Sequence, residues 1–286
     1  MKDFSKKLIW PLILIIFLDI FIIGQYRLAN QQRVIFCDVG QGDGAMIVMG
    51  ATQIIVDGGP DNSLAGCVGK YMPYFDRKIE YLIISHPDAD HFVGAVEILR
   101  RYFVERVIVN GDESDSPEWR EFKKLAQGKI TVANENFGID LPVGKIDFLY
   151  PDEKHPVPEV KHETNDYSLV FKFIFPLVIK GEVAKPMGDS GISILFTGDA
   201  TETTEENLLG RGADVSSDIL KVGHHGSKFS STKEFLKAVG PKLAVISAGA
   251  DNKYGHPANI ILKRLENLGI KYLRTDESGD IIVNFE

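Results

Sequence analysis

Four side chains that commonly bind metal ions stand within residues 86–91, which read HPDADH. This segment follows the short apolar run 81–85, which has the pattern of a buried strand, and precedes the helical spacing of residues 92–102. A buried strand more often ends in a simple turn, so two imidazoles and two carboxylates here indicate a site. Imidazole nitrogens and carboxylate oxygens are ligands for zinc, manganese or iron.

The spacing within this segment predicts two groups of ligands. We expect His86 and Asp88 to face one side and Asp90 the other. His91 follows at the predicted start of a helix. This arrangement could divide four ligands between two ions.

Other predicted strands end in the same residue types. Asp57 follows IIV, Asp199 follows ILFTG, and the pair His224 and His225 follows ILKVG. Taken singly, an aspartate before a turn is more often a local cap, and a histidine pair in a loop is more often on the surface. Their repetition at successive strand ends predicts one edge of the sheets where they meet.

From residue 33 onward, short β-branched runs alternate with helical patterns. The early half is rich in strands and the later half alternates strand and helix, which predicts two mixed sheets sandwiched between helices. Without a proline- or serine-rich linker, residues 31–286 are predicted to form one domain after a separate segment, 1–30. The predicted strands are 34–37, 45–49, 53–56, 81–85, 106–110, 168–175, 192–197, 219–222 and 243–247, with two short ones at the end, and 168–175 pairs with 192–197 across a loop containing 180–190. The predicted helices are 92–102, 117–126, 201–209, 232–239 and 257–268.

Residues 8–24 are apolar apart from Pro11 and Asp19. As a helix they would reach roughly 26 Å, close to the ~30 Å hydrocarbon core of a bilayer. A helix in a soluble core would show polar positions every third or fourth residue. The lysines before this segment predict a cytoplasmic N-terminal side, and therefore a single-pass cell-membrane protein whose domain is extracytoplasmic. The alternative is a secreted protein after cleavage of a signal peptide, but residues 27–29 (RLA) are a poor cleavage site.

The chain has two cysteines, Cys37 and Cys67, too few for a disulfide framework. We favour the interpretation that they are two small apolar residues. The alternative is one disulfide, which an extracytoplasmic location would permit.

The formal net charge of -8, from 32 basic and 40 acidic side chains, argues against an extended basic surface for nucleic acid. Residues 1–30 carry four basic and two acidic groups, so the rest of the chain is more acidic still. Bound divalent ions would reverse the local sign of charge at a site. The acidic balance therefore does not exclude a phosphate-bearing substrate.

HPDADH resembles the HxHxDH signature of the metallo-β-lactamase superfamily, with Asp88 in place of the second histidine. Further segments occur in the order seen in the metallo-β-lactamase-fold domain of ComEC-type competence (DNA-uptake) proteins, across nearly all of residues 33–286. They are FCDVGQGDGAMIV, IIVDGG, SHPDADHFVG, NDYSLVF, ILFTGDA, LKVGHHGS, YGHP and RTDESG. The resemblance implies an α/β (α+β) fold, a four-layer αββα sandwich, here preceded by one N-terminal transmembrane helix. With one candidate span, the chain is expected to be a membrane-tethered relative and not a channel.

The resemblance also implies a set of metal ligands. It divides them between two divalent ions, zinc or manganese. The ligands of the first ion would be His86 and Asp88, those of the second Asp90, His91 and His225, and Asp199 would bridge the two.

Four further residues would support these ligands. Asp57 matches an aspartate that orients the ligands, and Asp38 and Asp43 in DVGQGD are expected at the same edge. Asn165 stands where many members of the superfamily have another histidine. An amide is a weak ligand, so the first ion would be held more weakly or would be absent.

Several residues are candidates for contact with substrate. We favour His225 as ligand and His224 as phosphate contact or proton donor, with the reverse as the alternative, and we count His224, Asp90 and Asp199 as catalytic. His256 would touch substrate or cap the following helix. The remaining candidates, in a loop that could equally be structural, are Lys221, Ser227 and Lys228, whereas His155 and His162 are interpreted as surface residues.

The chemistry implied is hydrolysis by a hydroxide bound between two metal ions. The resemblance favours a phosphodiesterase or nuclease related to DNA uptake, acting on a phosphodiester such as DNA and working with competence or envelope proteins. One alternative is a hydrolase of a small or cell-wall-linked ester, such as a β-lactam or phosphocholine-like group. Another is a metal-binding module that binds DNA or an envelope partner without catalysis.

Overall fold

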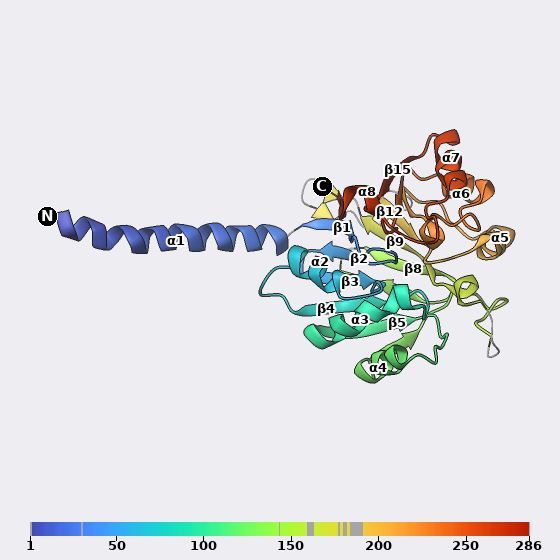
Figure 1. Ribbon diagram of the computed structural model, residues 1–286, viewed down its shortest axis with the longest axis horizontal. Helices are drawn as coiled ribbons and strands as arrows, with labels where there is room; N and C mark the ends of the chain where they lie inside the picture. Colours follow the sequence, from blue (N-terminus) through green and yellow to red (C-terminus); the bar gives the residue numbers. More distant parts are fainter. Residues whose placement is uncertain are drawn as a thin grey trace.

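The computed structural model describes residues 2–29, 31–142, 144–158, 163–176, 178–179, 182–183 and 191–285. Two seven-stranded mixed sheets lie face to face, and helices cover the outer side of each (Figure 1). The predicted αββα sandwich is confirmed. Buried phenylalanines such as Phe36, Phe171 and Phe196 fill the space between the sheets.

The first sheet is built from the early part of the chain and closed by the last strand. Its strands, in spatial order, are β16 (Ile281–Asn284), β1 (Gln32–Phe36), β2 (Ala45–Met49), β3 (Thr52–Val56), β4 (Lys78–Ile83), β5 (Phe103–Val109) and β6 (Ile130–Val132). Three helices pack on its outer face, namely α2 (Ser63–Tyr71), α3 (Ala89–Arg101) and α4 (Pro117–Leu125).

The second sheet comes from the later part of the chain. Its strands are β15 (Lys271–Arg274), β14 (Leu243–Ile246), β13 (Ile219–Lys221), β12 (Gly191–Phe196), β9 (Val170–Pro176), β8 (Lys145–Tyr150) and β7 (Gly138–Asp140). Its outer helices are α5 (Glu202–Gly210), α6 (Lys233–Val239) and α7 (Asn259–Asn267). The smaller elements are α8 (Thr275–Ser278), the hairpin of β10 (Val178–Ile179) and β11 (Glu182–Val183), and the 3₁₀ turns η1 (Thr164–Tyr167) and η2 (Gly223–Gly226).

Parallel pairing brings the site-bearing strand ends together. In the first sheet β3 and β4 are parallel, and in the second sheet β12 and β13 are parallel. The carboxyl ends of parallel strands meet at one edge of a sheet, so the residues that follow these strands are neighbours. The predicted pairing of 168–175 with 192–197 is confirmed, with Ile192 opposite Phe175. The predicted intervening loop lies mostly outside the described residues.

The helix α1 (Lys2–Ala29) extends away from the sandwich as a long rod (Figure 1). Within it, Trp10–Ala29 has a mean hydropathy of 2.0 and none of it is buried against the domain. By length and composition this helix could cross a membrane or serve as a signal sequence.

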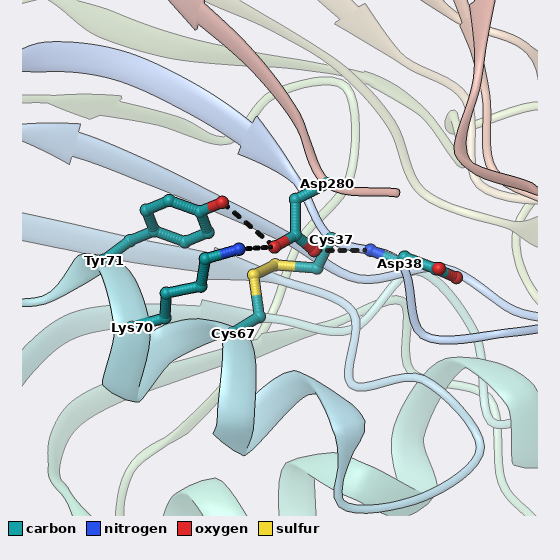
Figure 2. Close-up of a disulfide and its surroundings, with 6 residues drawn as sticks. All are labelled: Cys37, Asp38, Cys67, Lys70, Tyr71 and Asp280. Carbon is teal, nitrogen blue, oxygen red and sulfur yellow. Dashed lines mark hydrogen bonds and ion pairs between the residues drawn. A yellow bond between two sulfur atoms is a disulfide. The ribbon is translucent and has the colours of Figure 1, made fainter. Parts of the chain in front are cut away.

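Cys37 and Cys67 form a disulfide that joins the end of β1 to α2 (Figure 2). The favoured interpretation of two unpaired apolar residues is therefore wrong. The two cysteines meet through the tertiary structure. The helix α2, which the sequence analysis did not predict, places Cys67 against the end of β1, and the Cα atoms of the two cysteines are 6.1 Å apart. Beside the bridge, the Asp280 carboxylate accepts hydrogen bonds from Lys70 and Tyr71.

Candidate metal centre

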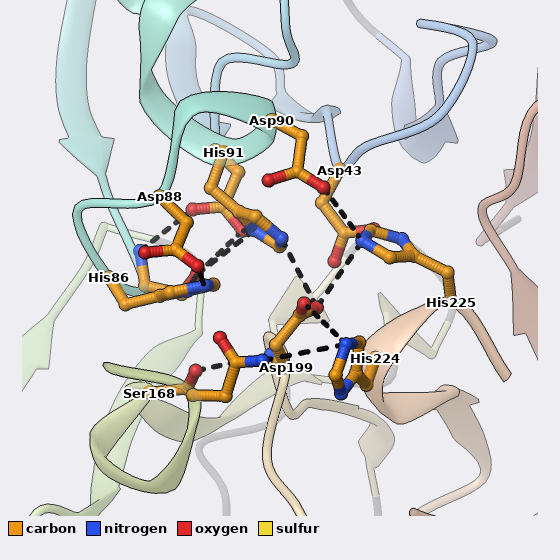
Figure 3. Close-up of polar contacts among 12 residues, drawn as sticks. Asp43, His86, Asp88, Asp90, His91, Ser168, Asp199, His224 and His225 are labelled. Atoms are coloured by element: carbon orange, nitrogen blue, oxygen red, sulfur yellow. Dashed lines mark hydrogen bonds and ion pairs between the residues drawn. The ribbon is translucent and has the colours of Figure 1, made fainter. Parts of the chain in front are cut away.

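A buried cluster of histidines and aspartates lies at the edge where the two sheets meet (Figure 3). His86 follows β4, and His91 stands in the first turn of α3. Asp199 follows β12, and His225 lies in η2 directly after β13. Both sheets therefore contribute to the cluster, as the repeated strand-end pattern predicts.

His91 is held by the first sheet and directed at the second. Its Nδ1 lies 3.0 Å from Asp57 Oδ2, and its Nε2 lies 3.1 Å from Asp199 Oδ1. The other oxygen of Asp57 accepts a hydrogen bond from Ser85 N at 2.7 Å. A carboxylate on one ring nitrogen fixes the tautomer that leaves the other free for a metal, and Asp57 is placed to orient His91 in this way.

His225 is oriented in the same way from the other sheet. Its Nδ1 lies 3.0 Å from Ser247 O and 3.2 Å from Asp43 Oδ1. Its Nε2 lies 3.4 Å from Asp90 Oδ2 and 3.5 Å from Asp199 Oδ1. This geometry favours His225 over its neighbour in the pair as the ligand.

The histidine pair has an unusual backbone. His224 and His225 both have positive φ, 49° and 53°, a region that residues with a Cβ rarely adopt. The planes of the two imidazole rings make an angle of 78°. Strain of this kind is retained where the surrounding structure over-determines it, often at functional sites.

His86 and Asp88 form the other side of the cluster. His86 Nε2 lies 3.7 Å from Asp88 Oδ2, and Asp88 Oδ1 accepts a hydrogen bond from Thr164 Oγ1 at 2.7 Å. The rings of His86 and His91 are 4.2 Å apart. Asp90 turns instead toward His225, so His91 lies between His86 on one side and Asp90 and His225 on the other.

Several polar atoms of the cluster are buried and, among the described residues, have no hydrogen-bond partner. Burying a polar atom without a partner costs about 1–3 kcal/mol, so such atoms in one place call for a ligand. Ligand atoms of His86, His91 and Asp199, and of Asp90, His91 and His225, lie within 4.8 Å of one another. The residues therefore fit divalent cations. The unpartnered atoms are His86 Nε2, His91 Nε2, His225 Nε2, Asp43 Oδ1 and Asp199 Oδ1.

The buried carboxylates and imidazoles of the cluster shift one another's pKa values. Burial opposes ionisation of Asp199, but the charges of His225 and His91 outweigh it and hold the pKa of that carboxyl well below its usual range. Burial lowers the pKa of His225, whereas the charges of Asp199 and Asp43 outweigh this effect and raise it to about 10. In the absence of metal these imidazoles hold protons, and a cation binding there must displace them.

Two further histidines lie on the more open side of the cluster. His224 Nε2 is 3.6 Å from Asp199 Oδ2 and 3.4 Å from the Asn165 amide nitrogen, and its side chain is 24% exposed. The His256 ring is 5.6 Å from that of His224. Burial lowers the pKa of both imidazoles, that of His256 to about 4, so both are neutral at pH 7.

For two of the candidate substrate contacts the structure favours the structural alternative. Lys221 is buried, with Nζ 2.7 Å from Asp43 Oδ2 and donating to a backbone carbonyl, so it is not an exposed phosphate contact. Ser227 is also buried, within the turn that follows η2. Asp38 follows β1 at the edge that also carries Asp43; its side chain is exposed and accepts a hydrogen bond from Gly40 N, and among the described residues no contact with the cluster is found for it.

The remaining candidates lie outside the cluster. Lys228 is exposed and its Nζ lies 4.8 Å from the Phe229 ring centroid. His155 pairs with Asp152 at 2.9 Å, and His162 lies outside the described residues. The sequence did not indicate the roles of Ser85 and Ser247, although Ser85 directly precedes the motif. No motif in the sequence marks Ser247. It reaches His225 because it follows β14, which pairs with β13.

Two mixed sheets between helical layers, with a histidine–aspartate cluster at their shared edge, define an αββα protein with a candidate metal centre. The chain belongs to the metallo-beta-lactamase superfamily, whose family description matches residues 38–250.

The comparisons also find competence proteins. The chain is 28% identical over 274 residues to ComE operon protein 3 of Bacillus subtilis (strain 168), covering 89% of this chain and 33% of that one. It is 30% identical over 258 residues to Competence protein ComA of Neisseria gonorrhoeae, covering 87% and 32%. The chain thus spans about a third of the length of these relatives. The metallo-beta-lactamase fold protein YhfI from Bacillus subtilis shares the fold, with a TM-score of 0.57 at 12% identity, over 88% of this chain and 99% of that one.

Proposed function

We propose that this protein is a metal-dependent hydrolase that cleaves phosphodiesters. The observation that carries the proposal is the convergence of His91 Nε2 and His225 Nε2 on the same oxygen of Asp199, at 3.1 and 3.5 Å. Each imidazole is oriented by a buried carboxylate, Asp57 or Asp43, on its other nitrogen. Divalent ions held there would lower the pKa of a bound water and neutralise charge on a phosphoryl group.

The protein's own residues would bind and orient the substrate around this centre. His224 is neutral and partly exposed next to Asp199, so its ring N–H can donate to a phosphoryl oxygen or to the leaving oxygen. His256 lies next to it, with the two ring centroids 5.6 Å apart. The Asn165 amide lies against the His224 ring, with its nitrogen 3.4 Å from His224 Nε2.

The relation to competence proteins supports DNA as the phosphodiester. The exposed Lys228 is a candidate phosphate contact beside the histidine pair. The formal net charge of -8 argues against an extended basic surface, so binding of DNA would depend on the metal centre and on a few local cations.

The test uses the purified full-length chain in detergent, loaded with manganese or zinc. We would measure bound metal, then hydrolysis of bis-p-nitrophenyl phosphate, single-stranded DNA and duplex DNA. Asp90→Asn should lose most of the activity, whereas the matched control Asp38→Asn should retain it, because Asp38 lies outside the cluster. A protein that binds no metal, or equal activity in both variants, would refute the proposal. Cleavage of the small ester alone would refute the assignment of DNA.

We also propose that α1 anchors the protein in the cell membrane with the domain outside the cytoplasm. The apolar segment Trp10–Ala29 and the preceding lysines support this orientation. The Cys37–Cys67 disulfide supports an oxidising compartment. N-terminal sequencing of the membrane-extracted protein tests whether the helix is retained, and protease digestion of intact cells tests on which side the domain lies.

A further inference from the structure

The loop between α2 and β4, residues 72–77, contacts the helix α1. Tyr74 N donates a hydrogen bond to Gln25 Oε1 at 2.6 Å. The rings of Phe21 and Tyr74 meet edge to face with centroids 6.4 Å apart. Figure 1 shows this loop on the side of the domain from which α1 departs. The 72–77 loop is therefore fixed against the apolar helix.

These contacts fix the position of the loop along the axis of α1. Gln25 and Phe21 precede Ala29, the end of the apolar segment, by about one and two helical turns. At about 1.5 Å per residue, they lie roughly 6 and 12 Å inside that end. If α1 spans the bilayer, Tyr74 is thus at the level of the outer interfacial region.

The side chains of the loop suit that environment. Tyr74 and Phe75 are 72% and 67% exposed, which is unusual for two adjacent large aromatic residues. Aromatic side chains are enriched at the membrane–water interface, where the ring lies among lipid and the polar end reaches water. Arg77 lies over the Tyr74 ring, with its guanidinium carbon 6.0 Å from the ring centroid. The Asp76 carboxylate accepts hydrogen bonds from Lys78 N and from Gln53, within the protein.

The metal centre lies at the opposite end of the same strands. β4 begins at Lys78, immediately after the loop, and leads to His86. Eight residues of extended chain span about 26 Å. Likewise β3 runs from Thr52 to Val56 and leads to Asp57, and β1 starts near the end of α1 and leads to the loop that carries Asp43. The first sheet therefore separates the loop from the cluster along its strands.

We propose that the 72–77 loop docks on the outer surface of the lipid bilayer beside α1. Tyr74 and Phe75 enter the interfacial region, and Arg77 faces anionic headgroups. This docking holds the metal centre at the end of the domain that points away from the membrane. Substrate then reaches the site from the aqueous phase and not from the bilayer. The inference rests on the membrane-spanning role proposed for α1.

Site-directed spin labelling of the full-length chain in vesicles of phosphatidylethanolamine and phosphatidylglycerol tests this arrangement. Because both native cysteines are bonded to each other, an introduced cysteine is the free thiol that takes the label. Phe75→Cys reports on the loop, Phe17→Cys on the helix, and Phe229→Cys on the face next to the histidine pair. All three side chains are exposed, so the substitutions leave the core intact.

For each label we would compare collisions with oxygen, which concentrates in lipid, with those of a water-soluble nickel complex. The label at 75 should show a several-fold higher ratio of oxygen to nickel collisions than the label at 229. If the label at residue 17 is in lipid while the label at residue 75 is as exposed to water as the label at residue 229, the docking of the loop is refuted, whereas the proposal that α1 spans the membrane still holds. If the label at residue 17 is also in water, α1 does not span the membrane, and both the span and the docking are refuted. Neither result bears on hydrolysis, which is measured separately.

Discussion

The Lys221 ammonium lies 2.7 Å from Asp43 Oδ2, and both side chains are buried beneath the metal cluster. The second oxygen of Asp43 lies 3.2 Å from His225 Nδ1. One carboxylate therefore joins a buried cation on β13 to an imidazole that faces Asp199. It also ties the loop after β1 in the first sheet to the second sheet.

Lys221→Met should destabilise the protein by about 1.5–3 kcal/mol, because the buried Asp43 carboxylate loses one of its two cationic partners and keeps only His225. Urea unfolding with metal removed by chelation measures this effect. The matched control is Lys242→Met, which removes an exposed pair with Asp218 and should cost less than about 1 kcal/mol. Equal losses in the two variants would contradict the interpretation that the Asp43 pair is structurally essential.

Asp57→Asn should weaken metal binding by about 10–100-fold, because the amide no longer fixes the His91 tautomer. The expected change is in affinity, so it is measured by competition with a chromophoric chelator and does not depend on an assay of activity. Asp61→Asn is the control, since Asp61 is exposed and caps only the local turn at Ser63. Unchanged affinity in Asp57→Asn would show that Asp57 does not orient the ligand.

Because of Glu205, the free energy of unfolding should fall as pH rises from about 4.5 to 7. Burial raises the pKa of this carboxyl from 4.5 to about 7, although backbone N–H groups of Thr232 and Ser231 favour its ionised form. In that window the folded protein binds more protons than the unfolded chain, so unfolding becomes easier with increasing pH. The shift corresponds to about 3 kcal/mol.

Glu205→Gln removes this titration and should flatten the dependence of unfolding free energy on pH over the same window. Glu206→Gln, an exposed neighbour on α5, should leave the slope as in the wild type. Urea midpoints measured at several pH values compare the three proteins. A slope in Glu205→Gln equal to that of the wild type would assign the effect to other groups.

Replacing both Cys37 and Cys67 with alanine should lower the free energy of unfolding by about 3–4 kcal/mol, because the bridge closes a loop of 30 residues in the unfolded chain. Thermal and urea unfolding of the double variant measure the loss, and reducing agent added to the wild type should reproduce it. A variant as stable as the wild type would indicate that the bridge contributes little beyond local packing.

The fold was largely accessible from the sequence, because most strands and helices carry clear periodicity. The helix after HPDADH nevertheless begins at Ala89, earlier than the predicted residue 92. Its first turn carries ligands in place of apolar residues, so the pattern that marks a buried face is missing there. β8 (Lys145–Tyr150) alternates buried and half-buried residues, yet it was not predicted.

The site was predictable where its residues lie close together in the chain. His86 to His91 form one local motif, and Asp57 and Asp199 each follow a recognisable strand. The pairing of Asp43 with Lys221 was not accessible, because it joins the loop after β1 to β13, far apart in the chain. Sequence reasoning therefore left open whether Lys221 contacts phosphate or is structural. It favoured unpaired cysteines, because α2, which positions Cys67, was not predicted.

The cluster draws His86 and His91 from the first sheet and Asp199 and His225 from the second. A divalent ion coordinated by both groups would act as a cross-link between the two halves of the sandwich. Such a ligand stabilises the folded state in proportion to the logarithm of its concentration relative to its dissociation constant. The supply of metal in the surrounding compartment would then set how long the folded protein persists there, as well as whether it can act.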